Sequence, residues 1–334
     1  MKLEPELEQV PSPPNDRVMR GARHVVDVKR LLDDLCGPSR SSWIVEQLCP
    51  GLFNAAQSAL DGDAFLAAVV PFVEEEAAEV PALVPVSAMI GESWKWHECT
   101  SSWRSADELE VYLTAPERAF RSDPDASLST YVEALGLAVA FEGKNRVRFL
   151  RDRGVEHVPS AVAIAGYPAA ERLKIVHVQT GRGKRAWCVL DDRWLEPLIL
   201  PAVSHAILDP YGVRTLHRWP SDWPKAGAVE KALERAAGGR PHQPVDLRQL
   251  LDRQAELESQ DEWIHTSAIG LDVYRLRWRP VLMGVTGVLL ATFASAVLPA
   301  PYAGPLSWGL SGAAVGFAVA WCAPLLRARR RHVA

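Results

Sequence analysis

A short stretch near the middle of the chain combines residue types that bind phosphate groups. It consists of Glu142, Gly143, Lys144, Asn145 and Arg146. A glycine at a strand-to-helix turn brings backbone N–H groups to the helix N-terminus, where anions bind. Lys144 and Arg146 add positive charge, and Asn145 adds a hydrogen-bond donor and an acceptor. The stretch therefore predicts a phosphate-binding turn, although turns of this composition are common and most of them bind nothing.

The residues around this turn predict the elements that would position it. An apolar run at 137–141 is typical of a buried strand. Residues 145–153 have helical spacing, and Gly154 stands where a glycine commonly follows the end of a helix. A second strand is expected at 160–165. The turn should therefore lie within a strand–helix–strand segment of an α+β domain.

Together these motifs resemble the phosphate-binding box of the ParB/sulfiredoxin-like superfamily. That pattern is a strand, an acidic or glycine residue, glycine, two variable residues, arginine, a helix, glycine and Val-Pro. The Val-Pro pair at 158–159 matches its end, and residues 84–90 resemble the family's first strand and turn. The His-Glu pair at 97–98 is similar to one that some members carry just after that strand. The resemblance covers residues 81–168 and implies a small mixed sheet with helices.

The resemblance also implies a ligand, which is a nucleoside triphosphate (CTP or ATP) with Mg²⁺. It assigns the phosphates to Gly143, Lys144, Asn145 and Arg146. Glu98 and Glu142 become the catalytic candidates, which hold Mg²⁺ or take a proton from an acceptor hydroxyl. Each has a simpler interpretation, because Glu142 and Glu98 can be solvated loop carboxylates and Arg146 can form a structural salt bridge. Lys144 occupies the position of the sulfiredoxin cysteine, which argues against sulfur chemistry.

Two functional hypotheses follow. The first is a membrane-anchored protein that binds a nucleoside triphosphate and uses it for phosphoryl transfer or hydrolysis. The second is a non-catalytic ParB-like module that recruits a protein partner, or DNA, to the membrane. Nucleic acid is the less favoured partner, because the 37 basic and 41 acidic residues nearly balance and no DNA-binding helices are recognisable.

The C-terminal region is the most hydrophobic part of the chain. Residues 281–298 and 306–326 are apolar runs whose lengths suit membrane-spanning helices, and no charged residue occurs between 280 and 326. Arginines flank both runs on the outside, at 275, 277 and 279 and at 327, 329, 330 and 331. By the positive-inside tendency, the main domain and both termini are expected in the cytoplasm, at the inner membrane, with anionic lipid as a partner.

The rest of the chain divides by composition. Residues 1–22 are proline-rich and are expected to form a disordered arm, without a signal peptide. A helical unit is expected at 23–79, with helices at 23–35 and 63–78, followed by the ParB-like domain at 80–168. Residues 169–275 predict an α/β extension with a hairpin and amphipathic helices, and residues 276–334 predict the two membrane helices.

Two smaller features complete the expectations. Asp191 and Asp192 are expected to cap a helix that begins at Arg193, or to hold Mg²⁺. The five cysteines have no paired spacing, which indicates reduced and mostly buried thiols rather than a metal site.

Overall fold

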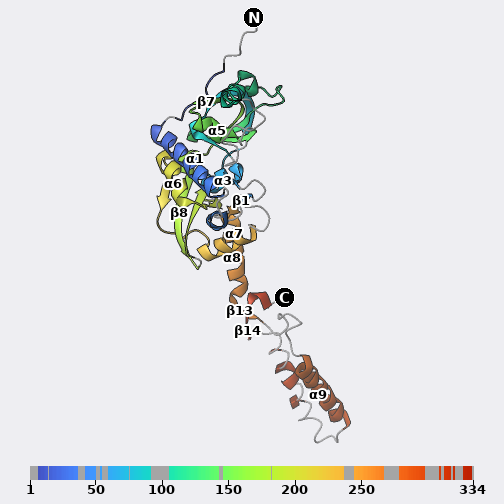
Figure 1. The fold of residues 1–334 in the computed structure, drawn as a ribbon. Coiled ribbons are helices and arrows are strands. Elements are labelled where there is room, and N and C mark those ends of the chain that lie inside the picture. Colours follow the sequence, from blue (N-terminus) through green and yellow to red (C-terminus); the bar gives the residue numbers. More distant parts are fainter. Residues whose placement is uncertain are drawn as a thin grey trace. The chain divides into compact units, whose positions relative to one another are not determined.

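The computed structural model divides the chain into two units, Met1–Leu250 and Leu251–Ala334. It describes residues 7–13, 15–36, 42–49, 53–54, 59–74, 76–91, 105–142, 146–181, 183–236, 244–266, 278–297, 308–309, 312–316, 319 and 326–332. These residues form an α+β fold with two five-stranded mixed sheets, both in the first unit (Figure 1). The expected fold class is therefore confirmed at this level.

The first sheet has the strand order β3-β7-β5-β6-β4. Parallel pairs join β4 to β6 and β5 to β7, and the other pairs are antiparallel. Helices α4 (Ala106–Leu113) and α5 (Val147–Asp152) cover one face of this sheet, where they share a core with Tyr131 and Val162. The strands are β3 (Glu76–Pro85), β4 (Met89–Ile90), β5 (Leu128–Val132), β6 (Leu137–Glu142) and β7 (His157–Ala165).

The second sheet has the order β11-β8-β9-β10-β12, with β11 and β8 parallel and the remaining pairs antiparallel. Helix α7 (Ala226–Ala236) packs on one face, through Val229 against Trp187 and Leu195. The strands are β8 (Leu173–Thr180), β9 (Gly183–Leu190), β10 (Trp194–Pro197), β11 (Arg214–Leu216) and β12 (Val245–Asp246).

A layer of helices lies between the two sheets and shares one hydrophobic core with both (Figure 1). The most extensive contact between helices of this layer joins α1 to α6. The two backbones approach closely at Gly21, where a Cβ atom would lie 2.4 Å from the carbonyl oxygen of Ala206. The helices of this layer are α1 (Asp16–Cys36), α2 (Ser42–Leu48), α3 (Gly62–Val69) and α6 (Pro201–Tyr211). A two-stranded hairpin, β1 (Phe53–Asn54) and β2 (Ala59–Leu60), precedes α3.

Local signals in the sequence predicted several elements correctly. The Ser105 side chain accepts a hydrogen bond from the backbone N–H of Glu108 and caps α4. The apolar run at 137–141 is β6, and the expected hairpin is β8 and β9. Gly154 has a φ of 75° just after α5, which is the left-handed conformation that favours glycine there. The described cysteines, Cys36, Cys49 and Cys188, are buried free thiols.

Other predicted boundaries were wrong. Helix α1 begins at Asp16, so residues 16–22 are helical rather than part of a disordered arm. The Asn15 side chain accepts a hydrogen bond from the backbone N–H of Arg17 at 2.8 Å, as a helix-capping residue does. The arm is also held further upstream, where buried Val10 donates its N–H to the Leu83 carbonyl.

The helix expected at 63–78 ends at Val69, two residues before Pro71. Glu76 and Glu79, beyond this helix, belong to β3, which pairs with β7. This long-range pairing outweighs the helical propensity of the Glu and Ala residues in the segment.

The Asp191-Asp192 pair does not cap a helix. Both residues have positive φ angles, 54° and 53°, in the turn that leads into β10. Asp191 forms an ion pair with Arg172 at 2.7 Å, and Asp192 forms one with Lys174 at 2.5 Å. Aspartate tolerates the left-handed conformation, which explains the turn. The two carboxylates pair with Lys174 of β8 and with Arg172, which directly precedes β8.

In the second unit, β13 (Trp263–Thr266) pairs with β14 (Leu326–Arg329). Leu326, expected to end an apolar helix, therefore begins a strand instead. The arginines that follow form ion pairs with acids at the end of α8 (Leu247–Asp261) or just beyond it, at 3.2 Å for Arg329 with Asp261 and 3.1 Å for Arg330 with Glu262.

Helix α9 (Trp278–Val297) contains residues 281–297 of the first apolar run. Among the described residues, no helix combines the length and the apolar character needed to cross a bilayer. Most of the second run, at 306–326, lies outside the described residues.

Candidate functional site

The parallel pairing of β4 and β6 brings the ends of these two strands to the same edge of the first sheet. Met89 lies opposite Ala138, and Ile90 lies opposite Val139. Open sheets commonly bind ligands just beyond the carboxyl ends of such strands. The segments that leave this edge carry the His-Glu pair at 97–98 and the predicted phosphate-binding turn.

Four of the six predicted site residues lie outside the described part of the chain: Glu98, Gly143, Lys144 and Asn145. Glu142 is the last residue of β6 and lies opposite Leu128 of β5, and nothing is described of its side chain. The roles of these five residues therefore stay predictions.

Arg146, the sixth residue, directly precedes α5. It lines a cavity of about 10 Å³, together with Arg118, Ser127 and Leu113, on the side of α5 that faces α4. This cavity adjoins the larger cationic pocket described below, because Met89 and Val147 line both. The phosphate-binding role of Arg146 also remains a prediction.

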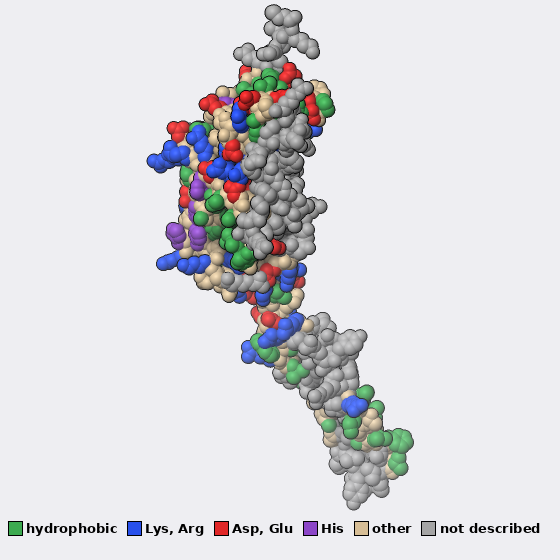
Figure 2. Space-filling view, viewed as in Figure 1, with side chains coloured by type: hydrophobic (Ala, Val, Ile, Leu, Met, Phe, Trp, Pro, Cys, Tyr) green, Lys and Arg blue, Asp and Glu red, His purple; other side chains and the backbone are tan. Residues whose placement is uncertain are grey.

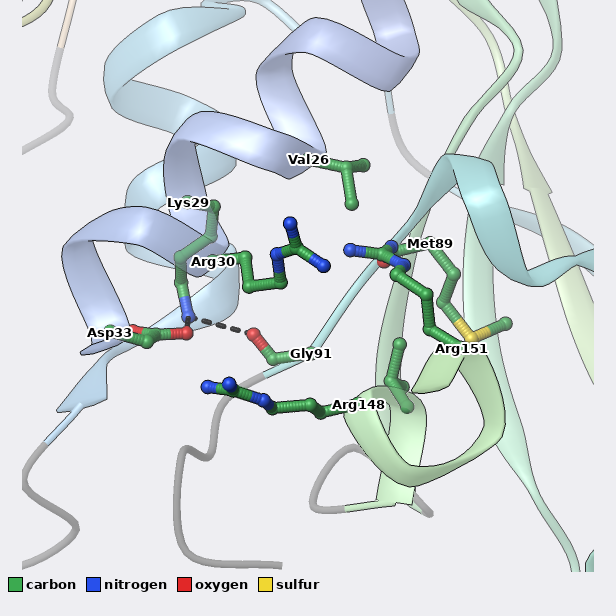
Figure 3. A pocket seen from close by; sticks show the side chains of 9 residues that line it. Val26, Lys29, Arg30, Asp33, Met89, Gly91, Arg148 and Arg151 are labelled. Atoms are coloured by element: carbon green, nitrogen blue, oxygen red, sulfur yellow. Dashed lines mark hydrogen bonds and ion pairs between the residues drawn. The ribbon is translucent and has the colours of Figure 1, made fainter. Parts of the chain in front are cut away.

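The cationic pocket lies between α1, the end of β4 and α5 (Figure 3). Its volume is about 30 Å³, which suits a few atoms but no sugar or base. Four of its side chains are positively charged and one is negatively charged, so the lining has an excess of three positive charges. The lining residues are Val26, Lys29, Arg30, Asp33, Met89, Gly91, Val147, Arg148 and Arg151.

One of the four cations is neutralised inside the protein. The Lys29 ammonium donates to Asp33 Oδ2 at 2.6 Å and to the Gly91 carbonyl at 2.7 Å, and both side chains are almost completely buried. The other Asp33 oxygen accepts the backbone N–H of Leu60 at 3.0 Å. This network ties α1 to the residue that follows β4, and its role is to position that edge of the sheet.

Arg148 is also compensated. It forms an ion pair with Asp34 of α1, and its Nε lies 3.6 Å from Asp152. That Nε is buried and has no hydrogen-bond partner within the described residues.

Arg30 and Arg151 are the two cations without an ion pair among the described residues, and Figure 3 shows their guanidinium groups extending toward one another. Arg151 donates to the carbonyls of Val86 and Met89, at 3.0 and 3.2 Å, which fixes its position. Burial lowers the pKa of Arg151, and the positive charge of Arg30 lowers it further. An anion placed between the two groups would relieve this repulsion.

A wider cleft adjoins the cationic pocket, because Arg151 lines both. The cleft has a volume of about 510 Å³, which lies within the usual range of small-molecule sites. Arg23 and Asp27, on the exposed face of α1, form one wall, and His157 and Ser87 belong to its lining. An elongated anion could therefore place a charged end in the pocket and its organic part in the cleft.

Sequence reasoning missed this pocket, because its cations come from segments far apart in the chain. One local signal was present: Lys29 lies on the apolar face of α1, four residues after Val25 and four before Asp33. A lysine with an aspartate at this spacing on a buried face indicates an internal ion pair. Arg30, one residue further, carries no such signal.

No protein-family model, no curated protein and no solved structure matches the chain. The described part of the chain also contains no group of three or more His, Cys, Asp or Glu side chains arranged to hold a metal ion.

Proposed function

We propose that the protein binds a nucleoside triphosphate, CTP or ATP with Mg²⁺, at the edge where β4 and β6 end. The phosphates lie against Arg30 and Arg151, beside the turn at 143–146, and the nucleoside lies in the wider cleft. The observation that carries this proposal is the approach of these two arginines at the carboxyl ends of parallel strands. A polyphosphate supplies the negative charge that their arrangement lacks.

We also propose that the chain belongs to the ParB/sulfiredoxin-like superfamily. The mixed first sheet, the close succession of β6 and α5 along the chain, and the glycine after α5 support it. Glu98 and Glu142 are the proposed ligands of Mg²⁺ or acceptors of a proton. Release of inorganic phosphate from a bound nucleotide would identify an enzyme, and binding without release would identify a recruiting module.

The test is a calorimetric titration of the full chain with ATP, CTP and GTP in the presence of Mg²⁺. We expect at least one of them to bind, and we expect Arg30→Ala to weaken that binding about tenfold, because hydrogen bonds to charged groups contribute roughly 1.5–3 kcal/mol. Arg20→Ala is the matched control, since Arg20 is an exposed arginine of the same helix outside the pocket. The proposal fails if no triphosphate binds or if both variants behave alike.

We also propose that the C-terminal apolar runs attach the protein to the inner membrane, with the first unit in the cytoplasm. In α9, large apolar side chains are exposed on the helix surface, among them Met283 at 75% and Phe293 at 74%. A helix that is apolar on all sides is not stable in water and needs a hydrocarbon environment or a protein core.

Liposome flotation tests this attachment. We expect the full chain to float with vesicles at high salt, because apolar insertion is not screened by ions. Leu289→Asp should release it, since an aspartate in the middle of an inserted helix costs roughly 2.5–3.5 kcal/mol. Val111→Asp, at another exposed apolar position, should float like the wild type. A wild-type chain that stays unbound would contradict the attachment.

A further inference from the structure

Three histidines and an aspartate gather on an exposed edge of the second sheet, away from the cationic pocket. His177 belongs to β8, His205 and Asp209 belong to α6, and His217 follows β11. Histidine side chains form a visible patch on this face, near β8 and α6 (Figure 2). His177 and His205 are only partly buried, so small solutes can reach them.

Two of these rings face each other through their Nε2 atoms. The Nε2 atoms of His177 and His205 are 2.9 Å apart, the ring planes differ by 6°, and the ring centroids are 5.1 Å apart. Two imidazole nitrogens at this distance share one proton, which one ring donates and the other accepts. His217 flanks the pair, with its centroid 6.3 Å from that of His177.

Asp209 determines which of the two rings accepts the hydrogen bond between them. Its Oδ1 lies 2.9 Å from Nδ1 of His205, so this nitrogen carries a proton that it donates to the carboxylate. In neutral His205, Nε2 is then the unprotonated nitrogen, with its lone pair directed at His177. A carboxylate on the far nitrogen of a histidine is the arrangement that orients histidine ligands of metal ions.

We propose that His177 and His205 bind one divalent transition-metal ion of the zinc or nickel class through their Nε2 atoms. The ion replaces the shared proton, and water completes its coordination, because the described residues provide no third ligand in position. At a Zn–N distance of about 2.0–2.1 Å, tetrahedral coordination separates the two nitrogens by about 3.3 Å, so the rings move apart by about 0.4 Å and turn until both lone pairs point at the ion.

The protons balance when the ion binds. In the metal-free pair, His177 is the ring that carries the shared proton on Nε2. On binding, its Nε2 proton is exchanged through solvent for one on Nδ1, and no net proton is released. His205 keeps the Nδ1 proton that it shares with Asp209, which makes Asp209 a positioning residue.

Titration of the full chain with Ni²⁺, followed by calorimetry and by the rise in melting temperature, tests the site. We expect one ion per chain, and at least a tenfold loss of affinity in His177→Ala and in His205→Ala. Asp209→Asn should weaken binding roughly tenfold while both histidines remain, as loss of an outer partner does. His24→Ala, an exposed histidine of α1, should bind like the wild type.

The melting temperature without metal shows whether each variant is folded. His205→Gln, which keeps the size of the side chain, replaces the alanine variant if that variant does not fold. The assignment is overturned if the folded His177 and His205 variants bind Ni²⁺ as the wild type does, or if the wild type binds none.

Discussion

Replacing Lys29 by methionine is expected to destabilise the protein by about 3–5 kcal/mol, which is the usual effect of removing one partner from a buried ion pair. The substitution leaves the Asp33 carboxylate buried without its cation, and it leaves the Gly91 carbonyl without its donor. Urea unfolding followed by tryptophan fluorescence measures the change. We expect the variant to unfold at a clearly lower urea concentration than the wild type.

Two further variants separate the ion pair from general effects on α1. Arg30→Met, at the next position but with an exposed side chain, should change stability by less than about 0.5 kcal/mol. The double variant Lys29→Met with Asp33→Leu should recover part of the loss, because no buried charge remains. An effect of Lys29→Met as small as that of Arg30→Met would show that the buried network does not hold the end of β4.

Replacing Glu196 by glutamine is expected to remove a pH-dependent loss of stability. Glu196 lies on β10 opposite Cys188, is 6% exposed, and has its pKa raised by burial from the usual 4.5 to about 7. Its carboxyl group is therefore protonated in the folded protein at a pH where it is ionised in the unfolded chain. The contribution of Glu196 to the free energy of unfolding should therefore fall by up to about 3 kcal/mol as the pH rises from 4.5 to 7. Above pH 7 this contribution should stay constant.

Unfolding measured across this pH range checks the effect. Glu196→Gln should abolish this contribution and should be more stable than the wild type above pH 7, because the amide has no charge to bury. Glu117→Gln, at an exposed position, should retain the wild-type pH profile. An unchanged profile in Glu196→Gln would contradict the raised pKa.

Some parts of the fold could be predicted from the sequence, and others could not. Local features were sufficient for the Ser105 cap, the glycine after α5 and the β8–β9 hairpin, because each depends on residues within one turn or loop. The start of β3, at 76–80, was not predictable in this way, although the strand was expected from 81 onward. This Glu- and Ala-rich start favours a helix, and only pairing with β7, far along the chain, makes it a strand.

The candidate site was predictable only in part. Strand β6 and helix α5 follow from local patterns, and the turn between them lies outside the described residues. The cationic pocket does not, because Lys29 and Gly91 are 62 residues apart and meet only when α1 packs against the end of β4. Arg30 has no pattern of its own, and its position opposite Arg151 results from that packing.

The most direct test of the anion site is a crystal structure of the full chain grown with the triphosphate that binds most tightly. We predict electron density for phosphate groups within hydrogen-bond distance of both Arg30 and Arg151, with the nucleoside in the adjoining cleft. Density for the nucleotide at any other place, with these two arginines still facing each other and no anion between them, would contradict the account.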